Sequence, residues 1–458
     1  MSRKENRRQF IKKSSAFAAG AAAIPYFFST RRSLASYYAD DKMKIGLIGC
    51  GGMGRGNMNS AREYLDIVAF SDADSRRMDE ANQQFAGGNG DNYADYRDML
   101  ERDDIKVVHV ATPDHWHTKP VVEAMLAGKD VYCEKPLTLT VDEGKLIRKV
   151  QEDTGCILQV GTQQRSTYNL FTKAMALVAE GRLGRINKVT SAIGGAPTCD
   201  SIPVADVPEG LDWDRWLGPA PMVDYRFVQN DNRRNTNCHY EFRWWYEYSG
   251  GKLTDWGAHH VDIAMWALAL NGQTDGPLSI GGEAEHPVEF VDGMPQQNDR
   301  YNTSNSFNLI AKFPGDTEVH IVSNGRNGCL IEGDKGRIFV SRGDLTGAPV
   351  EALADNPLPE DAILKINKGV EMQHNERKAH WFNFLQCVRE RSEPISDVHT
   401  HMEALNICHL AGIAARLGRE IQWDAASQQI TGDDQANSML ARPYREGYEI
   451  EMATTAAG

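Results

Sequence analysis

The sequence predicts an α/β protein in which a doubly wound parallel sheet is followed by an α+β domain with a mostly antiparallel, open sheet. Two patterns predict this architecture. In the first third of the chain, short unbroken apolar runs alternate with amphipathic stretches, as in parallel strands that helices cover on both faces. Further along, the apolar runs alternate with polar residues and are bounded by turn residues, which is typical of antiparallel strands.

The parallel part is expected to contain five strands and five helices. The strands are expected at 43–48, 67–71, 107–111, 130–134 and 157–161. The helices are expected at 53–62, 74–86, 94–102, 117–127 and 140–153. Because ligands of such a sheet bind beyond the carboxyl ends of its strands, the residues that follow these strands are the first candidates for a site.

The second part is expected to open with a helix and a β-like stretch, followed by a long irregular polar region and further strands and helices. The expected helices are 168–181, 253–270, 373–392 and 397–417. The expected strands are 185–195, 305–313, 317–323, 328–333 and 336–341, and the irregular region is 196–250. Short alternating strands joined by turns favour an antiparallel sheet here.

These patterns divide the chain into a leader at 1–35, a parallel-sheet domain at 42–165, an α+β domain at 166–423 and a tail at 424–458. The leader carries Arg7-Arg8 before an apolar Ala/Gly-rich stretch and ends in Ser33-Leu34-Ala35, a small-residue cleavage site. It resembles a twin-arginine export signal, so we expect a periplasmic or otherwise exported protein. A disordered basic N-terminus is the alternative.

Composition excludes several classes of partner. With 458 residues and a net charge of −13, the chain is not expected to bind nucleic acid or an anionic membrane surface. It has no long apolar run, so no membrane anchor is expected. The eight cysteines form no C-x-x-C pair, and no metal site is expected. Cys199 and Cys238 could pair in an oxidising compartment, which the sequence does not decide.

A glycine-rich loop directly follows the first expected strand. In Gly49-Cys50-Gly51-Gly52-Met53-Gly54, the first glycine permits a tight turn, the second allows a pyrophosphate to approach, and the third lets helix and strand pack closely. The next strand ends in Asp72, about 20 residues after Gly51, where a carboxylate meets the ribose hydroxyls. The loop and Asp72 predict a dinucleotide site, with NAD favoured over NADP.

The residues after the third and fourth strands are candidates for the other end of that dinucleotide. Asp114-His115-Trp116-His117 has the H-x-H spacing of a metal site, but it follows a strand of the nucleotide-binding sheet. We therefore expect Thr112, Pro113 and His117 to line the nicotinamide-ribose side. Lys135, in Glu134-Lys135-Pro136, could stabilise the alkoxide that develops as hydride leaves carbon. An exposed loop lysine is the alternative.

A second polar group lies on the helix expected over 253–270. Asp255, His259 and Asp262 fall at i, i+4 and i+7, which places them on one stripe of an otherwise apolar helix. His259 suits a general base that removes a hydroxyl proton, and Asp255 could orient it. The alternatives are a helix cap and a satisfied core histidine. Arg165, Trp245 and Asp262 are further candidates for contact with a sugar substrate, although tryptophans often only fix long loops.

Taken together, these motifs resemble the Gfo/Idh/MocA oxidoreductases over about residues 42–423. Further matches are Gly250-Gly251 before Asp255, and Glu332-Gly333-x-x-Gly336. The resemblance implies that Lys135, Asp255 and His259 form the catalytic set, that Glu134 belongs to the cofactor site, and that 166–423 binds substrate and forms a homodimer or homotetramer. Gly161–Arg165 and the long 196–250 region depart from the common pattern, so no particular sugar can be carried over.

Two activities follow from the resemblance. The first is hydride transfer between a sugar or cyclitol and a tightly bound NAD. The second is an NAD-dependent glycoside hydrolase that works by transient oxidation, elimination, hydration and re-reduction. The hydrolases of this kind lack the lysine of Glu-Lys-Pro, so the presence of Lys135 favours the dehydrogenase. A catalytically inert binding protein is a third, less favoured reading, because the Lys135, Asp255 and His259 set is intact.

Overall fold

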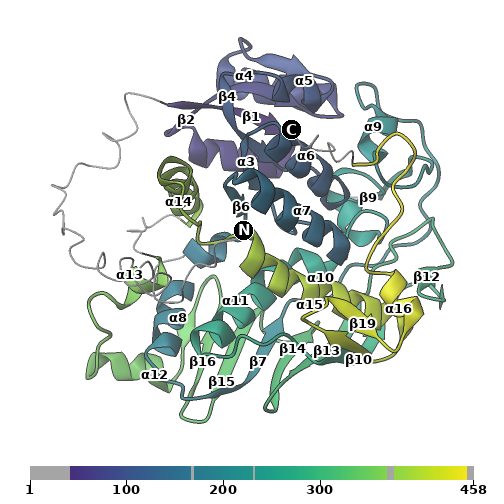
Figure 1. The fold of residues 1–458 in the computed structure, drawn as a ribbon. Helices are drawn as coiled ribbons and strands as arrows, with labels where there is room; N and C mark the ends of the chain where they lie inside the picture. Colours follow the sequence, from purple (N-terminus) through teal and green to yellow (C-terminus); the bar gives the residue numbers. More distant parts are fainter. Residues whose placement is uncertain (1–41, 167–169, 231–232, 369–375, 451–458) are drawn as a thin grey trace, which may run out of the picture. The chain divides into compact units, whose positions relative to one another are not determined.

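The computed structural model describes residues 42–166, 170–230, 233–368 and 376–450 (Figure 1). The expected export signal at 1–35 lies outside the described residues. Within the described part of the chain, no helix is both long and apolar enough to cross a membrane.

The first domain is built on a six-stranded parallel sheet in the order β3-β2-β1-β4-β5-β6. The strands are β1 (Met43–Ile48), β2 (Leu65–Ser71), β3 (Asp91–Tyr93), β4 (Ile105–Val110), β5 (Asp130–Cys133) and β6 (Leu158–Val160). The five expected strands are therefore confirmed. Strand β3 was not expected, because its three residues Asp-Asn-Tyr carry almost no apolar signal and pair only at the sheet edge.

Three of the helices of this domain begin at capping side chains. They are α3 (Gly52–Ala61), α4 (Ser75–Ala86), α5 (Tyr96–Leu100), α6 (Asp114–Leu126) and α7 (Val141–Thr154). The side chains of Asp74 and Asp95 cap α4 and α5, and Thr140 with Glu143 forms a capping box at α7. These caps align the first turns of the helices with the carboxyl edge of the sheet, where a ligand would bind.

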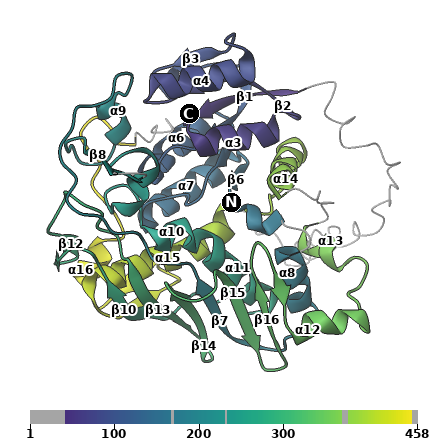
Figure 2. The same ribbon diagram turned by 180° about the vertical axis from the view of Figure 1, so that it is seen from behind.

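The second domain is built on a nine-stranded sheet in the order β17-β16-β15-β7-β14-β13-β10-β18-β19 (Figures 1 and 2). Only β7 and β14 pair in parallel. The strands are β7 (Ile186–Ala192), β10 (Ser279–Glu285), β13 (Ser306–Phe313), β14 (Thr317–Val322), β15 (Gly328–Gly333), β16 (Arg337–Val340), β17 (Leu345–Thr346), β18 (Ile421–Asp424) and β19 (Gln429–Thr431). The mostly antiparallel sheet is confirmed, whereas β10 was missed because two glycines interrupt it.

Helices cover one face of this sheet. They include α8 (Phe171–Ala179), α11 (Gly257–Leu270) and α15 (Val398–Leu417), of which α11 and α15 pack against each other and against the sheet. Shorter helices are α12 (Ala348–Glu351), α13 (Ala362–Ile366) and α16 (Asp434–Ser438), while α14 (Glu376–Glu390) packs on α3. The region expected to be a polar tail thus contains β19 and α16.

The helix expected over 253–270 is divided in two. A short helix α10 (Lys252–Asp255) is separated by Trp256 from α11. Gly257, the first residue of α11, lies so close to α15 that a Cβ there would approach Cys408 Sγ to 2.9 Å.

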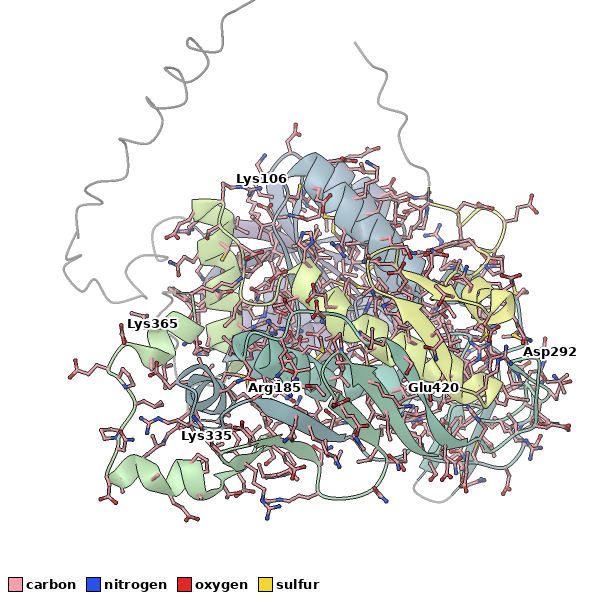
Figure 3. All side chains as sticks on the ribbon, turned by 60° about the horizontal axis from the view of Figure 1, so that its bottom comes forward. Lys106, Arg185, Asp292, Lys335, Lys365 and Glu420 are labelled. Atoms are coloured by element: carbon pink, nitrogen blue, oxygen red, sulfur yellow. The ribbon has the colours of Figure 1, made fainter. Side chains whose placement is uncertain are left out.

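The charged side chains labelled in Figure 3 are all exposed and lie near strand ends, in connections or on α13. Two small antiparallel ribbons complete the described strands: β8 (Phe227–Asn230) pairs with β9 (Arg233–Thr236), and β11 (Phe290–Val291) pairs with β12 (Met294–Pro295). The remaining described elements are the helix α9 (Trp213–Leu217) and the 3-10 turns η1 (Gln163–Ser166), η2 (His239–Trp244) and η3 (Ala352–Ala354).

No disulfide joins Cys199 and Cys238 in the described chain, where both cysteines are free. Cys199 Sγ accepts the Tyr301 N–H at 3.4 Å, and Cys238 is buried.

Candidate active site

A cleft of ≈ 1630 Å³ opens at the carboxyl ends of the parallel strands and is closed on its other side by parts of the 206–243 region. It brings together most of the predicted cofactor residues. Those that line it are Gly49, Gly51, Gly52, Met53, Asp72, Thr112, Pro113, His117 and Glu134, and Lys135 joins them. One continuous cavity therefore connects the glycine loop with the predicted catalytic lysine.

The glycine loop has the geometry of a phosphate cradle. Gly49 has a φ of +93°, which only glycine adopts readily, and a Cβ at Gly54 would lie 2.1 Å from the Gly49 carbonyl oxygen. Gly52 has open space where its Cβ would be. Because Gly51 occupies the N-cap of α3 and has no side chain, the first amides of α3 remain for an anion or water. These residues fit the pyrophosphate of a dinucleotide.

Asp72 lies at the end of β2, beside this loop. Its carboxylate accepts the Cys50 N–H at 2.6 Å and the Asp74 N–H at 2.8 Å. Burial raises the pKa of Asp72 in spite of these two bonds. Asp74 in turn binds Arg76 at 2.9 Å, and Arg77 lies 3.6 Å from the same carboxylate. The acidic side chain is therefore held at the position where ribose hydroxyls are recognised.

The segments after β4 and β5 are joined through His117. Its Nδ1 lies 2.6 Å from the Pro136 carbonyl oxygen and its Nε2 lies 2.9 Å from that of Thr112. His115 instead directs Nε2 to the Trp216 carbonyl at 3.1 Å. The H-x-H pair thus contacts carbonyl groups on different segments, and no group of three potential metal ligands occurs among the residues with described positions.

Glu134 is held between the two sides of the sheet end. Its Oε1 accepts hydrogen bonds from Asn57 Nδ2 at 2.7 Å and Gln163 Nε2 at 3.0 Å. A Cβ at Gly161 would lie 2.6 Å from the same oxygen, so only glycine leaves room for this carboxylate. Glu134 is therefore fixed at the cleft wall directly before Lys135.

Lys135 and Asp255 form an ion pair across the two domains. Lys135 Nζ donates to Asp255 Oδ1 at 2.6 Å and to the Asp255 carbonyl at 3.0 Å, and the Lys135–Pro136 peptide is cis. Arg243 Nε lies 3.5 Å from the same Oδ1. Burial would raise the pKa of Asp255, but the Lys135 and Arg243 cations outweigh it and lower the pKa to about 2. Asp255 is therefore a stable carboxylate, and Lys135 keeps one N–H for a substrate oxygen.

His259 lies near this pair, at the first turn of α11. The side chain is buried and packs edge-on against Trp256. Its Nδ1 has no hydrogen-bond partner among the residues that the structure describes. Burial, reinforced by the Lys135 charge, lowers the pKa of His259 well below its ordinary value. The imidazole is neutral at physiological pH and can accept a proton.

Three predicted substrate residues lie away from the cleft. Asp262 is fully buried and both of its oxygens bind Arg165, from Nε at 2.7 Å and Nη2 at 2.8 Å. Arg165 also donates to the Ile395 carbonyl at 3.2 Å. Trp245 is 3% exposed, with its indole N–H on the Thr236 carbonyl. The expectation that these three side chains contact substrate does not fit their positions, because their polar atoms are used within the protein.

The structure adds residues that the sequence analysis did not assign. Asp114, at the start of α6, lines the cleft and accepts the Ser249 hydroxyl at 2.5 Å, and burial raises its pKa to about 7. His401 on α15 accepts the Leu137 N–H at 3.4 Å and so supports the segment after Lys135. A carboxylate in the short connection from a strand to the next helix could have signalled Asp114, whereas no local pattern indicates His401.

Comparisons with known proteins agree with this geometry. The family model described as "Oxidoreductase family, NAD-binding Rossmann fold" matches residues 43–162, and "Oxidoreductase family, C-terminal alpha/beta domain" matches 197–450. Similar curated proteins include a glycosyl hydrolase family 109 protein of Shewanella pealeana, 33% identical over 165 residues (31% of this chain, 35% of that protein). Another is the inositol 2-dehydrogenase of Burkholderia multivorans, 28% identical over 207 residues (43% and 60%). The chain thus spans 35% to 60% of the length of these two relatives.

Solved structures share the fold over most of the chain. A levoglucosan dehydrogenase in complex with NADH and levoglucosan superposes with a TM-score of 0.59 at 19% identity, covering 83% of this chain and 99% of its own. An aldose-aldose oxidoreductase from Caulobacter crescentus gives 0.57 at 18% identity, covering 83% and 100%. Because the two family models together extend over most of the chain, this protein belongs to the Gfo/Idh/MocA oxidoreductase family.

Proposed function

We propose that the protein transfers a hydride between a CH–OH carbon of a sugar or cyclitol and a tightly bound nicotinamide cofactor. The observation that carries the proposal is the Lys135–Asp255 ion pair, whose lysine lines the same cleft as the glycine loop. The inositol 2-dehydrogenase among the relatives, and the levoglucosan dehydrogenase among the structures, support a polyol substrate.

The residues divide the chemistry between them. The cofactor, when bound, supplies the hydride acceptor. Lys135 donates a hydrogen bond to the reacting hydroxyl oxygen and stabilises the negative charge that grows there. His259, neutral because of its lowered pKa, removes the hydroxyl proton. Asp255 holds the Lys135 ammonium in place through its 2.6 Å contact.

NAD is favoured over NADP by the charges near Asp72. A buried carboxylate at the ribose position accepts ribose hydroxyls but repels a 2′-phosphate. Arg76 and Arg77, the cations close by, both lie within 4 Å of the Asp74 carboxylate, which offsets their charge. We therefore expect the protein to bind NADH more tightly than NADPH, as a direct titration of nucleotide fluorescence would measure.

A panel of free sugars, cyclitols and aryl glycosides, added to cofactor-loaded protein, tests the proposal. A lasting rise in absorbance at the reduced nicotinamide band on adding a free polyol supports hydride transfer. The alternative is a redox-assisted glycoside hydrolase, which the similarity to a glycosyl hydrolase family 109 protein favours. Release of the aglycone without a lasting absorbance change would establish the hydrolase in place of the dehydrogenase.

We also propose export by the twin-arginine route and assembly into a homodimer or homotetramer. The Arg7-Arg8 leader supports export. The alternating burial along β13 and β14, with the described helices α11 and α15 packed on the sheet, supports an open face that a second copy would cover. Export is tested by comparing the localisation of the tagged full chain with that of an Arg7→Lys/Arg8→Lys variant. The oligomeric state is tested by light scattering of the purified protein.

A further inference from the structure

The C-terminal segment Arg445–Glu449 reaches the cleft, although it follows the second domain in the sequence. In Figure 1 the yellow end of the chain runs from α16 toward α9 and α6. Gly447 and Tyr448 line the cleft together with Asp95, Trp116 and Arg215. We infer that Arg445–Glu449 is part of the cofactor-binding site, where with Asp212–Arg215 it forms a clasp over the adenosine end of the dinucleotide. The inference rests on the proposed function.

The position of the clasp identifies the part of the ligand. In a sheet of this kind a dinucleotide extends across the strand ends, with its pyrophosphate at the glycine loop. Lys135 follows β5 and marks the reacting end, whereas Asp72 follows β2 and marks the ribose of the adenosine. Asp95, which follows β3, lies still further in that direction. The clasp is therefore at the opposite end of the cleft from the catalytic pair.

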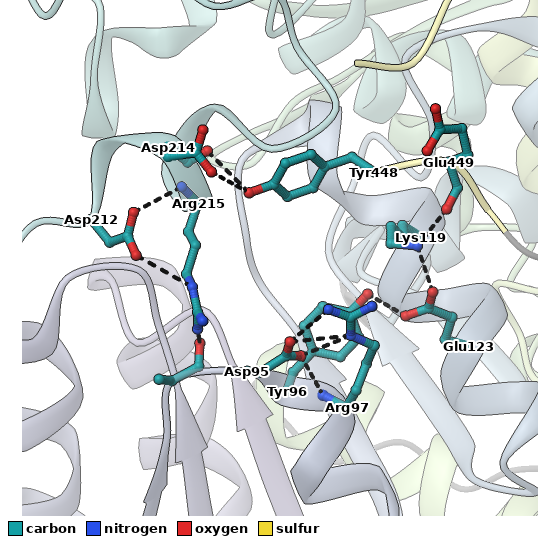
Figure 4. A network of polar contacts seen from close by, with 11 residues as sticks. Asp95, Tyr96, Arg97, Lys119, Glu123, Asp212, Asp214, Arg215, Tyr448 and Glu449 are labelled. Carbon is teal, nitrogen blue, oxygen red and sulfur yellow. Dashed lines mark hydrogen bonds and ion pairs between the residues drawn. The ribbon is translucent and has the colours of Figure 1, made fainter. Parts of the chain in front are cut away.

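Tyr448 makes the central contacts of the clasp (Figure 4). Its hydroxyl donates to Asp214 Oδ2 at 2.7 Å, and its ring packs edge-on against Trp116 with centroids 5.6 Å apart. The Arg445 guanidinium lies 4.5 Å from the Tyr448 ring centroid and donates to the Asp214 carbonyl at 2.7 Å. Hydrogen bonds from Arg445 and Tyr448 hold the pKa of Asp214 below its ordinary value, so the carboxylate stays charged.

The other half of the clasp joins α9 to the first domain. The Arg215 guanidinium donates to the Ala94 carbonyl and lies 3.3 Å from Asp212 Oδ2. Trp116 Nε1 donates to the Arg215 carbonyl at 3.0 Å. Lys119 on α6 donates to the Glu449 carbonyl at 2.6 Å and to Glu123 at 2.6 Å (Figure 4). Residues from α6, α9, the turn before α5 and the C-terminal segment thus make polar contacts around this end of the cleft.

The segment is anchored before it reaches the cleft. Arg442 donates to Glu143 Oε1 at 2.8 Å and to the His115 carbonyl at 2.6 Å, and the Tyr444 hydroxyl donates to Glu143 at 2.7 Å. Neither Arg442 nor Tyr444 is among the residues that line the cleft. The chain therefore offers two tyrosines with equivalent hydroxyl–carboxylate bonds, of which only Tyr448 would contact the ligand.

The consequence is slow exchange of the cofactor. A nucleotide under the clasp is released when the Tyr448–Asp214 bond opens. This bond is solvent-exposed, because the Asp214 side chain is 56% exposed. We therefore expect Tyr448→Phe and Asp214→Asn each to release NADH about threefold faster than the wild-type protein. The release rate is measured by stopped-flow loss of NADH fluorescence from the full-length holoprotein. Tyr444→Phe, the matched control, keeps the wild-type rate.

Competition with fragments of the dinucleotide shows which end the clasp contacts. ADP-ribose carries the adenosine end, and nicotinamide mononucleotide carries the other. Tyr448→Phe and Tyr448→Ala should weaken ADP-ribose binding and leave nicotinamide mononucleotide binding unchanged.

The outcomes separate this inference from the proposed function. If wild-type protein binds neither NADH nor ADP-ribose, the proposed function fails and the inference falls with it. If wild-type protein binds both, and the Tyr448 and Asp214 variants release NADH at the wild-type rate, the clasp is overturned while the proposed function stands. Equal acceleration by Tyr444→Phe would also overturn it, since the effect would then belong to the whole segment.

Discussion

Asp255 and Asp262 are seven residues apart, about two helical turns, and each is paired with a cation from the first domain, yet the two pairs differ in their role. The Lys135–Asp255 side chains are 9% and 12% exposed beside the cleft, and Arg243 offers a second cation. The Arg165–Asp262 side chains are 5% and 0% exposed and bind through two parallel bonds. The first pair keeps an N–H for a substrate, while the second leaves no carboxylate oxygen unused.

The contrast shows that a buried ion pair is not by itself a sign of catalysis. Burial alone would lower the pKa of Arg165, but the Asp262 carboxylate outweighs it and raises the pKa above its ordinary value. Burial also raises the pKa of Asp262, although the Arg165 cation opposes the shift. The two parallel bonds join η1 to α11 inside the protein. Substitutions in the Lys135–Asp255 pair, the accessible pair, should change turnover. Substitutions in the Arg165–Asp262 pair, the closed pair, should change only stability.

The largest expected effect is on turnover, from the accessible pair. Lys135→Met removes the donor to the reacting oxygen, so kcat should fall by about 10³-fold or more while the cofactor stays bound. Steady-state assays at the reduced nicotinamide band, with nucleotide content measured after acid extraction, check this. Lys149→Met, which breaks a solvent-exposed pair with Asp153, is the control. Wild-type turnover in Lys135→Met would remove the lysine from the mechanism.

The closed pair should respond in stability. Asp262→Asn leaves the buried Arg165 charge without its partner and should lower the free energy of unfolding by about 3–5 kcal/mol, as urea denaturation measures. The double variant Arg165→Met/Asp262→Leu should recover much of the loss, because both charges are then absent. Wild-type stability with lost turnover in Asp262→Asn would contradict the contrast and return Asp262 to the substrate site.

His259, a buried side chain near the Lys135–Asp255 pair, provides a further test of the proposed chemistry. His259→Ala removes the proton acceptor and should lower kcat by about 10²-fold or more, without loss of bound cofactor. Because the pKa of His259 is already well below its ordinary value, the wild-type kcat should not decline through protonation of this residue as pH falls from 7.5 to 6.5. If kcat does decline over this pH range and the decline disappears in His260→Asn, the titrating group is the neighbouring imidazole of His260.

The smallest expected effect concerns Asp114, a buried acid at the cleft without a cation of its own at bonding distance in the described structure. Its folded pKa of about 7 exceeds the unfolded value of about 3.9, so its contribution to stability is complete below pH 4 and is lost as pH rises through 7. Asp114→Asn should therefore gain stability relative to wild type between pH 5 and pH 8, by on the order of 2 °C in Tm. Asp153→Asn, in an exposed pair, should show no such trend.

Much of the fold was predictable because its signals are local. The strand period, the glycine loop and the caps of α4, α5 and α7 each depend on residues within a few positions of one another. Short or glycine-interrupted strands such as β3 and β10 were missed, since pairing with neighbours rather than local composition maintains them. The break at Trp256 has no local signal in the sequence, and Gly257 beside it packs against Cys408 of α15, more than 140 residues later.

The sequence by itself determined where a dinucleotide belongs and which residue types are available for hydride chemistry, because turn geometry, helix N-termini and strand ends follow from neighbouring residues. Only the tertiary structure decided which carboxylate meets which cation. Asp255 faces Lys135 and Asp262 faces Arg165 because segments far apart in sequence pack together, and Tyr448 reaches the cleft from the end of the chain for the same reason. Contacts of that kind depend on the packed core, which no local pattern encodes.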